Sequence, residues 1–224
     1  MNIGYIYYDL LNLYGDDGNI KALKQRLTNQ GVKVNIDYIS LGDIINFAKY
    51  DLVYIGSGTD DNLLIALDYL KEYKNDIKKY INNNKLFLST GNSVELFGKY
   101  IKKGEEKIEC LDIFDYYTEY NDKRIVNDIN YSTTLIDKNI IGFENHRGHI
   151  ISKEKNFLYK GDNKYGVLNN NFIGTYLIGP LLIRNPYFLE YYIKKILDIL
   201  KKEYKEDNYY LEIEAYKKAV ELIE

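Results

Sequence analysis

Short apolar runs alternate with stretches of helical periodicity over the first hundred residues, and this alternation limits the folds open to the chain. The runs with the pattern of buried strands are 2–8, 32–39, 51–55 and 86–88. Apolar side chains recur at helical spacing, or continue from a strand into an expected helix, over 20–27, 63–81 and 94–100. Strands that alternate with helices need crossover connections, which give a mostly parallel sheet covered on both faces. We therefore expect an α/β fold of three layers.

The pattern changes after Gly104. Three short β-prone segments follow with little helix between them, at 124–129, 131–136 and 140–144, and we expect short antiparallel strands or an excursion at the edge of the sheet. A strand is expected again at 172–177, and an amphipathic helix at 189–200.

The last residues carry a one-sided helical stripe formed by Tyr209, Ile213, Tyr216, Val220 and Ile223. We expect this stripe to pack on the chain's own domain, with a partner-binding helix as the alternative. The chain is accordingly divided into a domain over 1–203 and a C-terminal helical extension over 204–224.

The bulk composition excludes several classes of protein. A net charge of −3 argues against general binding of nucleic acid, which needs a basic face. The single cysteine, Cys110, excludes an internal disulfide and a multi-cysteine zinc site. The chain contains neither an apolar run near 18 residues nor a signal-peptide pattern, so we expect no membrane span and a cytoplasmic protein. We expect no metal and no cofactor.

Five segments, in order, resemble one family. They read LYGDDGNI at 13–20, DLVYIGSGTD at 51–60, YTEYNDKRIVN at 117–127, GFENH at 142–146 and GTYLIGPLLIRNP at 174–186. Together they are similar to the class I glutamine amidotransferases of the cobyric acid synthase type, and within it to the glutaminase subunits of lipid II isoglutaminyl synthase. The resemblance implies a flavodoxin-like fold.

In that family a cysteine on a strand-to-helix elbow attacks the glutamine side-chain amide, and a histidine acts as its base. By alignment with the family's motifs, Gly91 stands at the cysteine position and Ile178 at the histidine position. A glycine cannot attack and an isoleucine cannot accept a proton. The family mechanism of glutamine hydrolysis is therefore not expected here.

Other positions of the expected site have also changed. In the loop that holds the oxyanion in the family, Ser57 and Thr59 replace a glycine and a glutamine, while Gly58 remains. At the elbow, the chain has Asn92 and Ser93 where the family has glycines, and Glu95 where it has glutamine. These residues are the further candidates for a modified site.

Substitute catalytic groups are few. Cys110 lacks a glycine elbow, and a thiol in an ordinary environment is usually inert. Thr90 or Ser93 would need a base, which His146 or His149 would have to supply from another strand. As a metal pair these two histidines lack a convincing carboxylate partner, and His146 is better explained as a hydrogen-bonded structural residue.

Arg124 is the main candidate for binding a ligand. By resemblance it matches the arginine that holds the glutamine substrate, and a guanidinium suits a carboxylate because it donates two parallel hydrogen bonds. A structural ion pair is the alternative. The loop at 13–19 could bind an anion at a helix N-terminus, but a turn with Asp16 or Asp17 as helix cap explains it better.

Three functions follow from these residues. The first is a degenerate subunit that pairs, as a heterodimer, with a Mur-ligase-like synthetase that amidates the D-glutamate of the peptidoglycan precursor lipid II. The second is a module that binds or senses glutamine or another amino acid through Arg124. The third is an active amidotransferase with relocated catalytic residues.

Overall fold

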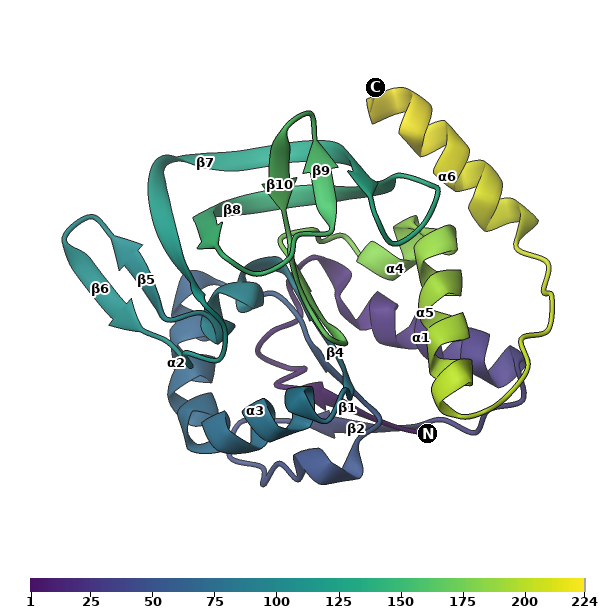
Figure 1. Cartoon of the computed structure of the whole chain (residues 1–224), viewed down its shortest axis with the longest axis horizontal. Coiled ribbons are helices and arrows are strands. Elements are labelled where there is room, and N and C mark those ends of the chain that lie inside the picture. The colour runs from purple at the N-terminus through teal and green to yellow at the C-terminus, as the bar shows by residue number, and fades with distance from the viewer. Residues whose placement is uncertain (224) are drawn as a thin grey trace.

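A six-stranded sheet forms the centre of the molecule, in the order β11-β12-β4-β3-β1-β2 (Figure 1). The computed structural model describes residues 1–223. The neighbours in this sheet are parallel except for the β11–β12 pair. Its strands are β1 (Asn2–Ile6), β2 (Asn35–Ile39), β3 (Leu52–Ile55), β4 (Leu86–Thr90), β11 (Val167–Asn169) and β12 (Phe172–Thr175).

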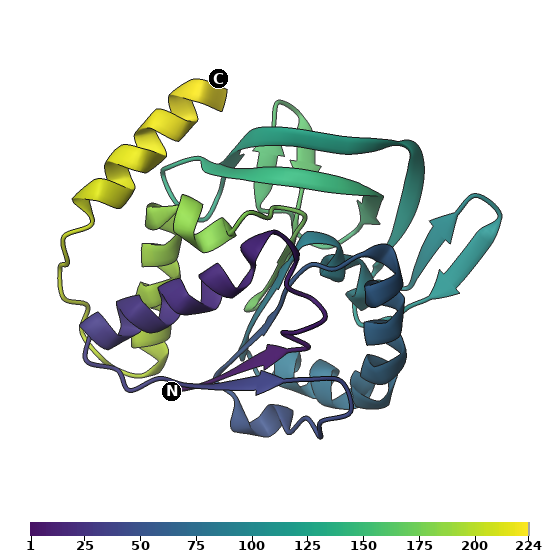
Figure 2. The same ribbon diagram turned by 180° about the vertical axis from the view of Figure 1, so that it is seen from behind.

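Helices cover both faces of this sheet, as the apolar strand runs require (Figure 1, Figure 2). The α-helices are α1 (Asp17–Asn29), α2 (Asp60–Leu70), α3 (Lys74–Asn82), α4 (Leu181–Arg184), α5 (Pro186–Ile199) and α6 (Tyr210–Ile223). The 3₁₀ segments are η1 (Leu13–Gly15), η2 (Phe47–Lys49), η3 (Lys71–Tyr73) and η4 (Gly91–Phe97). None of the helices within residues 1–223 is long and apolar enough to cross a bilayer.

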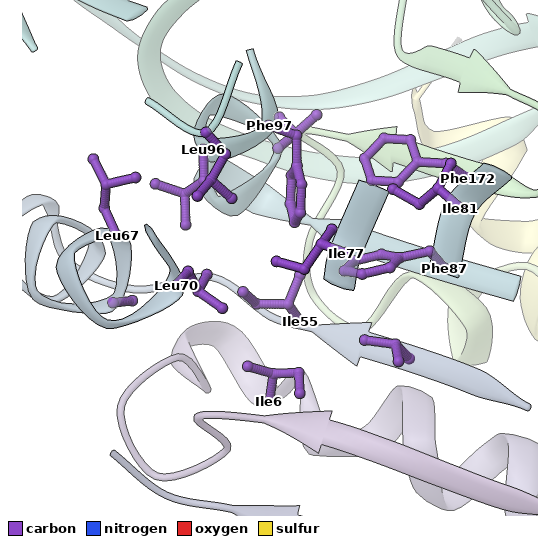
Figure 3. Close-up of a cluster of buried hydrophobic side chains, with 14 of the residues drawn as sticks. Ile6, Ile55, Leu67, Leu70, Ile77, Ile81, Phe87, Leu96, Phe97 and Phe172 are labelled. Carbon is purple, nitrogen blue, oxygen red and sulfur yellow. The ribbon is translucent and has the colours of Figure 1, made fainter. Parts of the chain in front are cut away.

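The side chains of β3 show how the sheet separates two cores. Val53 and Ile55 lie in the core shared with α2 and α3, whereas Leu52 and Tyr54 lie in the core shared with α1 and α5. Figure 3 shows the first core, where Phe87 and Phe172 of neighbouring strands meet the helical side chains. Alternate residues of each strand thus reach opposite faces, and both faces are buried.

A second sheet lies over the carboxyl ends of the first, with the order β10-β9-β7-β5-β6 and with β8 paired to β7. Its strands are β5 (Tyr100–Lys103), β6 (Glu106–Glu109), β7 (Tyr116–Thr133), β8 (Ile140–Ser152), β9 (Leu158–Lys160) and β10 (Asn163–Tyr165). The pair β7 and β8 forms a long antiparallel ribbon with an irregularity between Tyr120 and Ile125.

The predicted α/β fold with a mostly parallel sheet, helices on both faces and additional antiparallel strands is confirmed, but four predicted elements differ from those observed. The helix expected at 63–81 is two helices joined by η3. The helix expected at 94–100 is the 3₁₀ segment η4, and Tyr100 already belongs to β5. The strands expected at 124–129 and 131–136 are not separate, because residues 124–133 belong to the single strand β7, which pairs with β8 as far as Tyr131 and then with β9. Residues 134–136 lie after the end of this strand.

The C-terminal stripe faces the chain itself. The Tyr216 hydroxyl donates to the carbonyl of Asn139 at 2.7 Å, and its ring packs edge-on against Tyr187 of α5. Before α6, the side chain of Gln30 exchanges two hydrogen bonds with the backbone of Lys205, and the Arg26 guanidinium lies over the Tyr209 ring. These contacts hold α6 beside α5, and Figure 2 shows it there from behind.

Candidate functional site

The candidate site residues meet at the carboxyl edge of the central sheet. A cavity of about 270 Å³ opens there between the loops that follow β1, β3 and β4 and the ribbon of β7 and β8. Ligand sites of open α/β sheets occupy this edge. Of the predicted residues, those that line the cavity are Ser57, Gly58, Thr59, Gly91, Asn92, Arg124, His146 and Ile178. Two others, Ser93 and Glu95, are buried away from it.

The elbow after β4 keeps a backbone conformation that favours glycine. Gly91 has φ = +67°, a left-handed conformation that suits the sharp turn from strand to η4. A Cβ atom added at this residue would lie 2.3 Å from the Ser57 Cβ and 3.0 Å from a methyl of Ile178. The space that a nucleophilic side chain would need at the elbow is therefore filled by these two residues.

The buried carboxylate of Asp16 fixes Ser57 in that space. Asp16 Oδ2 accepts hydrogen bonds from the Ser57 backbone N–H at 2.8 Å and from its hydroxyl at 2.6 Å. The other oxygen accepts from the hydroxyls of Tyr54 and Thr90, at 3.0 and 3.1 Å. Burial raises the pKa of Asp16, while these donors act against that shift.

This network corrects the expectation that Asp16 or Asp17 caps the helix α1. Neither carboxylate caps it, and Asn12 accepts from the Asp17 backbone N–H instead. The same network removes Thr90 as a substitute nucleophile, because its buried hydroxyl already contacts Asp16 and Tyr54. The sequence marks Asp16 only through its place in the LYGDDGNI segment.

The carboxamide of Asn92 forms hydrogen bonds with the backbone of the loop at 56–59. Asn92 Oδ1 accepts from the Gly58 backbone N–H at 3.1 Å, and its Nδ2 donates to the Gly58 carbonyl at 2.9 Å. A backbone N–H can stabilise a developing oxyanion only if it is free to donate. Asn92 takes that donor, so Gly58 is satisfied internally. Thr59 caps α2, its hydroxyl accepting from the Asn62 N–H.

Ile178 has an apolar and largely structural environment. Its side chain is buried, and its backbone forms two hydrogen bonds with Phe143 of β8, at 3.0 and 3.3 Å. The residue joins the segment after β12 to the ribbon and offers no proton acceptor toward Gly91.

Arg124 lies at the mouth of the cavity, on β7. Its guanidinium donates to the side chain and the backbone carbonyl of Asn145, and Asn145 in turn donates to the Tyr14 hydroxyl. Within residues 1–223 it forms no ion pair, and its contacts there are these hydrogen bonds. The sequence did not single out Tyr14 or Asn145, although both belong to the resembling segments.

Glu95 links the elbow segment η4 to the strand β7 of the second sheet and to Tyr176 through hydrogen bonds. Its carboxylate accepts from the Tyr120 and Tyr176 hydroxyls at 3.1 and 3.0 Å, and burial raises its pKa to about 8. Gly148 is required beside it, because a Cβ there would lie 2.3 Å from the Tyr176 hydroxyl oxygen. Glu95 is thus a packing and hydrogen-bonding residue below the cavity.

The remaining candidates are not placed for nucleophilic chemistry. The buried Ser93 hydroxyl contacts Ser89 at 2.8 Å and the Thr90 carbonyl at 3.0 Å. Cys110 is buried near the β5–β6 hairpin, and burial raises its pKa to about 12. Neither side chain lines the cavity at the elbow, which contains His146 but not His149. In the described part of the chain, no three His, Cys, Asp or Glu side chains are grouped to hold a metal ion.

Comparison with known proteins identifies relatives across most of the chain. Residues 2–186 match the CobB/CobQ-like glutamine amidotransferase domain. The GatD subunit of lipid II isoglutaminyl synthase (glutamine-hydrolyzing) from Streptococcus pneumoniae is 33% identical over 230 residues, covering 96% of this chain and 85% of the relative. The GatD subunit from Staphylococcus aureus is also 33% identical, over 204 residues, covering 87% and 84%.

A solved glutamine amidotransferase from Thermotoga maritima has the same fold, with a TM-score of 0.54. It is 10% identical, and the match covers 98% of this chain and 90% of the other. At this identity the likeness concerns the fold alone.

The environment of Glu95 predicts a pH dependence of stability. Because its pKa is raised from an ordinary value of 4.5 to about 8, the native state favours the protonated carboxyl. The protonated Glu95 carboxyl makes its full contribution to the free energy of unfolding below about pH 4.5, and this contribution is lost as the pH rises through about 8. Glu95→Gln should therefore reduce the loss of unfolding free energy between pH 5 and pH 9, measured by urea denaturation. The control is Glu105→Gln at an exposed position; equal pH profiles for wild type and Glu95→Gln would contradict the assignment.

The contact between Gly91 and Ser57 predicts energetic coupling. Gly91→Cys should destabilise the chain by about 1–3 kcal/mol, because its side chain collides with Ser57. In a Ser57→Gly background the same change should cost at least about 1 kcal/mol less. Urea unfolding of the four proteins measures this coupling. Strictly additive effects would show that Ser57 does not fill the elbow space.

Proposed function

The chain belongs to the CobB/CobQ-like glutamine amidotransferase family, and we propose that it is a subunit in which the glutamine-splitting chemistry has been lost. The observation that carries the proposal is the filled elbow. Ser57 occupies the space of the family nucleophile, beside a glycine that has no side chain to attack with. Asn92 takes the Gly58 N–H, and Ile178 replaces the base. The substitutions are mutually adapted, which fits a maintained structure without the reaction.

The proposed role is that of a non-catalytic partner of a Mur-ligase-like synthetase. The two GatD relatives are subunits of lipid II isoglutaminyl synthase, and the chain spans most of their length. The synthetase would amidate the D-glutamate of lipid II with free ammonia, while this subunit braces or regulates it. In this proposal the domain spans 1–203 and residues 204–224 form its extension.

Co-expression tests the pairing. The chain and a Mur-ligase-like protein encoded beside it are expected to co-purify and to elute together as a heterodimer in size-exclusion chromatography. A stable chain that elutes alone, whether or not the synthetase is present, would contradict the proposed role.

A second function, amino-acid binding, is favoured by one observation. Arg124 has no anionic partner within residues 1–223 and stands at the mouth of an open cavity that is also lined by Asp60, whose carboxylate lies 4.0 Å from the Lys103 amine. A guanidinium and a carboxylate in one cavity match the two charges of a free amino acid.

Calorimetry decides between the two functions. If the cavity binds an amino acid, titration with glutamine or glutamate releases or takes up heat, and Arg124→Ala weakens binding by about tenfold or more. The matched control is Arg147→Ala, another exposed arginine of the ribbon. Absence of heat, or equal affinity for wild type and Arg124→Ala, rejects the binding function and leaves the first proposal intact.

A further inference from the structure

A buried histidine and a buried glutamate face each other behind the cavity at the elbow. His146 of β8 is 8% exposed, and its ring stacks on Tyr176 with ring centroids 3.7 Å apart. Its Nδ1 lies 2.7 Å from the Gly148 carbonyl oxygen. Since a carbonyl only accepts, Nδ1 carries the proton, and in the neutral ring Nε2 is an acceptor. Within residues 1–223 this buried Nε2 has no hydrogen-bond partner.

The glutamate residue is also buried, and within residues 1–223 only one of its two carboxylate oxygens accepts a hydrogen bond. Glu144 is 7% exposed, and its Oε1 accepts from the Tyr131 hydroxyl at 2.9 Å. Its Oε2 lies 3.8 Å from His146 Nε2, which is too long for a direct hydrogen bond. In the described part of the chain, His146 is the only basic side chain within 4 Å of this carboxylate. The free carboxylate oxygen of Glu144 and the free ring nitrogen of His146 thus face one another without a hydrogen bond between them.

Both groups line a second cavity of about 50 Å³, which adjoins the cavity at the elbow and shares His146 and Tyr176 with it. This volume has room for a small molecule or a few waters, since a single water needs at least about 10–15 Å³. Asn156, Tyr165 and His149 contribute to its wall, together with Lys164, whose amine is not within 4 Å of Glu144. The cavity is too small for an amino acid.

The chemistry of the pair selects its occupant. Two acceptors need a molecule with at least two hydrogen atoms to donate, and the carboxylate favours a positive one. We propose that Glu144 and His146 bind an ammonium ion, which donates one N–H to Oε2 and another to Nε2. A donor nitrogen about 2.8 Å from each satisfies both groups across their 3.8 Å gap. The site belongs to the isolated chain and does not depend on the proposed pairing with a synthetase.

Thermal unfolding of the full chain at pH 7 tests this site. Ammonium chloride at about 100 mM should raise Tm by about 2 °C or more relative to potassium chloride at the same concentration. Potassium carries the same charge but donates no hydrogen bond, and tetramethylammonium chloride, which has no N–H, should behave like potassium. In Glu144→Gln the preference for ammonium should vanish, because the amide keeps the shape and loses the charge.

A matched variant separates this site from a general salt effect. Lys164→Gln removes a cation from the same cavity wall, so it should keep or increase the ammonium preference. Equal Tm values for the wild type in ammonium and potassium would overturn the proposal, and they would indicate water between the two side chains. An ammonium effect that persists in Glu144→Gln would overturn it as well. Co-purification with a synthetase is unaffected by either result.

Discussion

The buried carboxylate of Asp16 holds together the loops on which the candidate site is built. It lies below the elbow and accepts four hydrogen bonds from Ser57, Tyr54 and Thr90. These residues come from the loop after β3, from β3 itself and from the end of β4. A charge that is removed from water at this depth needs all of these donors. The position of Ser57, and with it the shape of the elbow, therefore depends on a residue that never touches the cavity.

Loss of a nucleophile alone would leave a gap where its side chain had been, yet that position beside Gly91 is occupied. Ser57 and Ile178 fill the volume next to Gly91, and the Asn92 carboxamide binds both polar groups of the Gly58 peptide. In the proposed function, each replacement removes a separate requirement of the family's chemistry: the nucleophile, the base and the oxyanion donor. Together they also satisfy the packing and hydrogen bonding of a buried site, which explains how the fold tolerates them.

The strand and helix pattern predicted the central sheet because both of its faces are buried, which leaves a clear apolar signal. The ribbon of β7 and β8 was harder to predict. Residues 121–128 are exposed on it, and their order comes from pairing with a distant strand rather than from local periodicity. At the site, alignment with known motifs marked Gly91, Ile178 and Arg124. The roles of Asp16 and Asn92 could not be read from sequence, since both depend on contacts with loops far along the chain. Glycine at 148 is explained only by the approach of Tyr176.

The proposed function depends on whether the filled elbow still splits glutamine. Ammonia release from glutamine by the purified chain, measured alone and with a Mur-ligase-like partner and its substrates, tests this most directly. The account predicts no release above the rate of a heat-denatured sample in either case, while the synthetase works with ammonium salts. Catalytic release of ammonia from glutamine by the wild-type chain would contradict it.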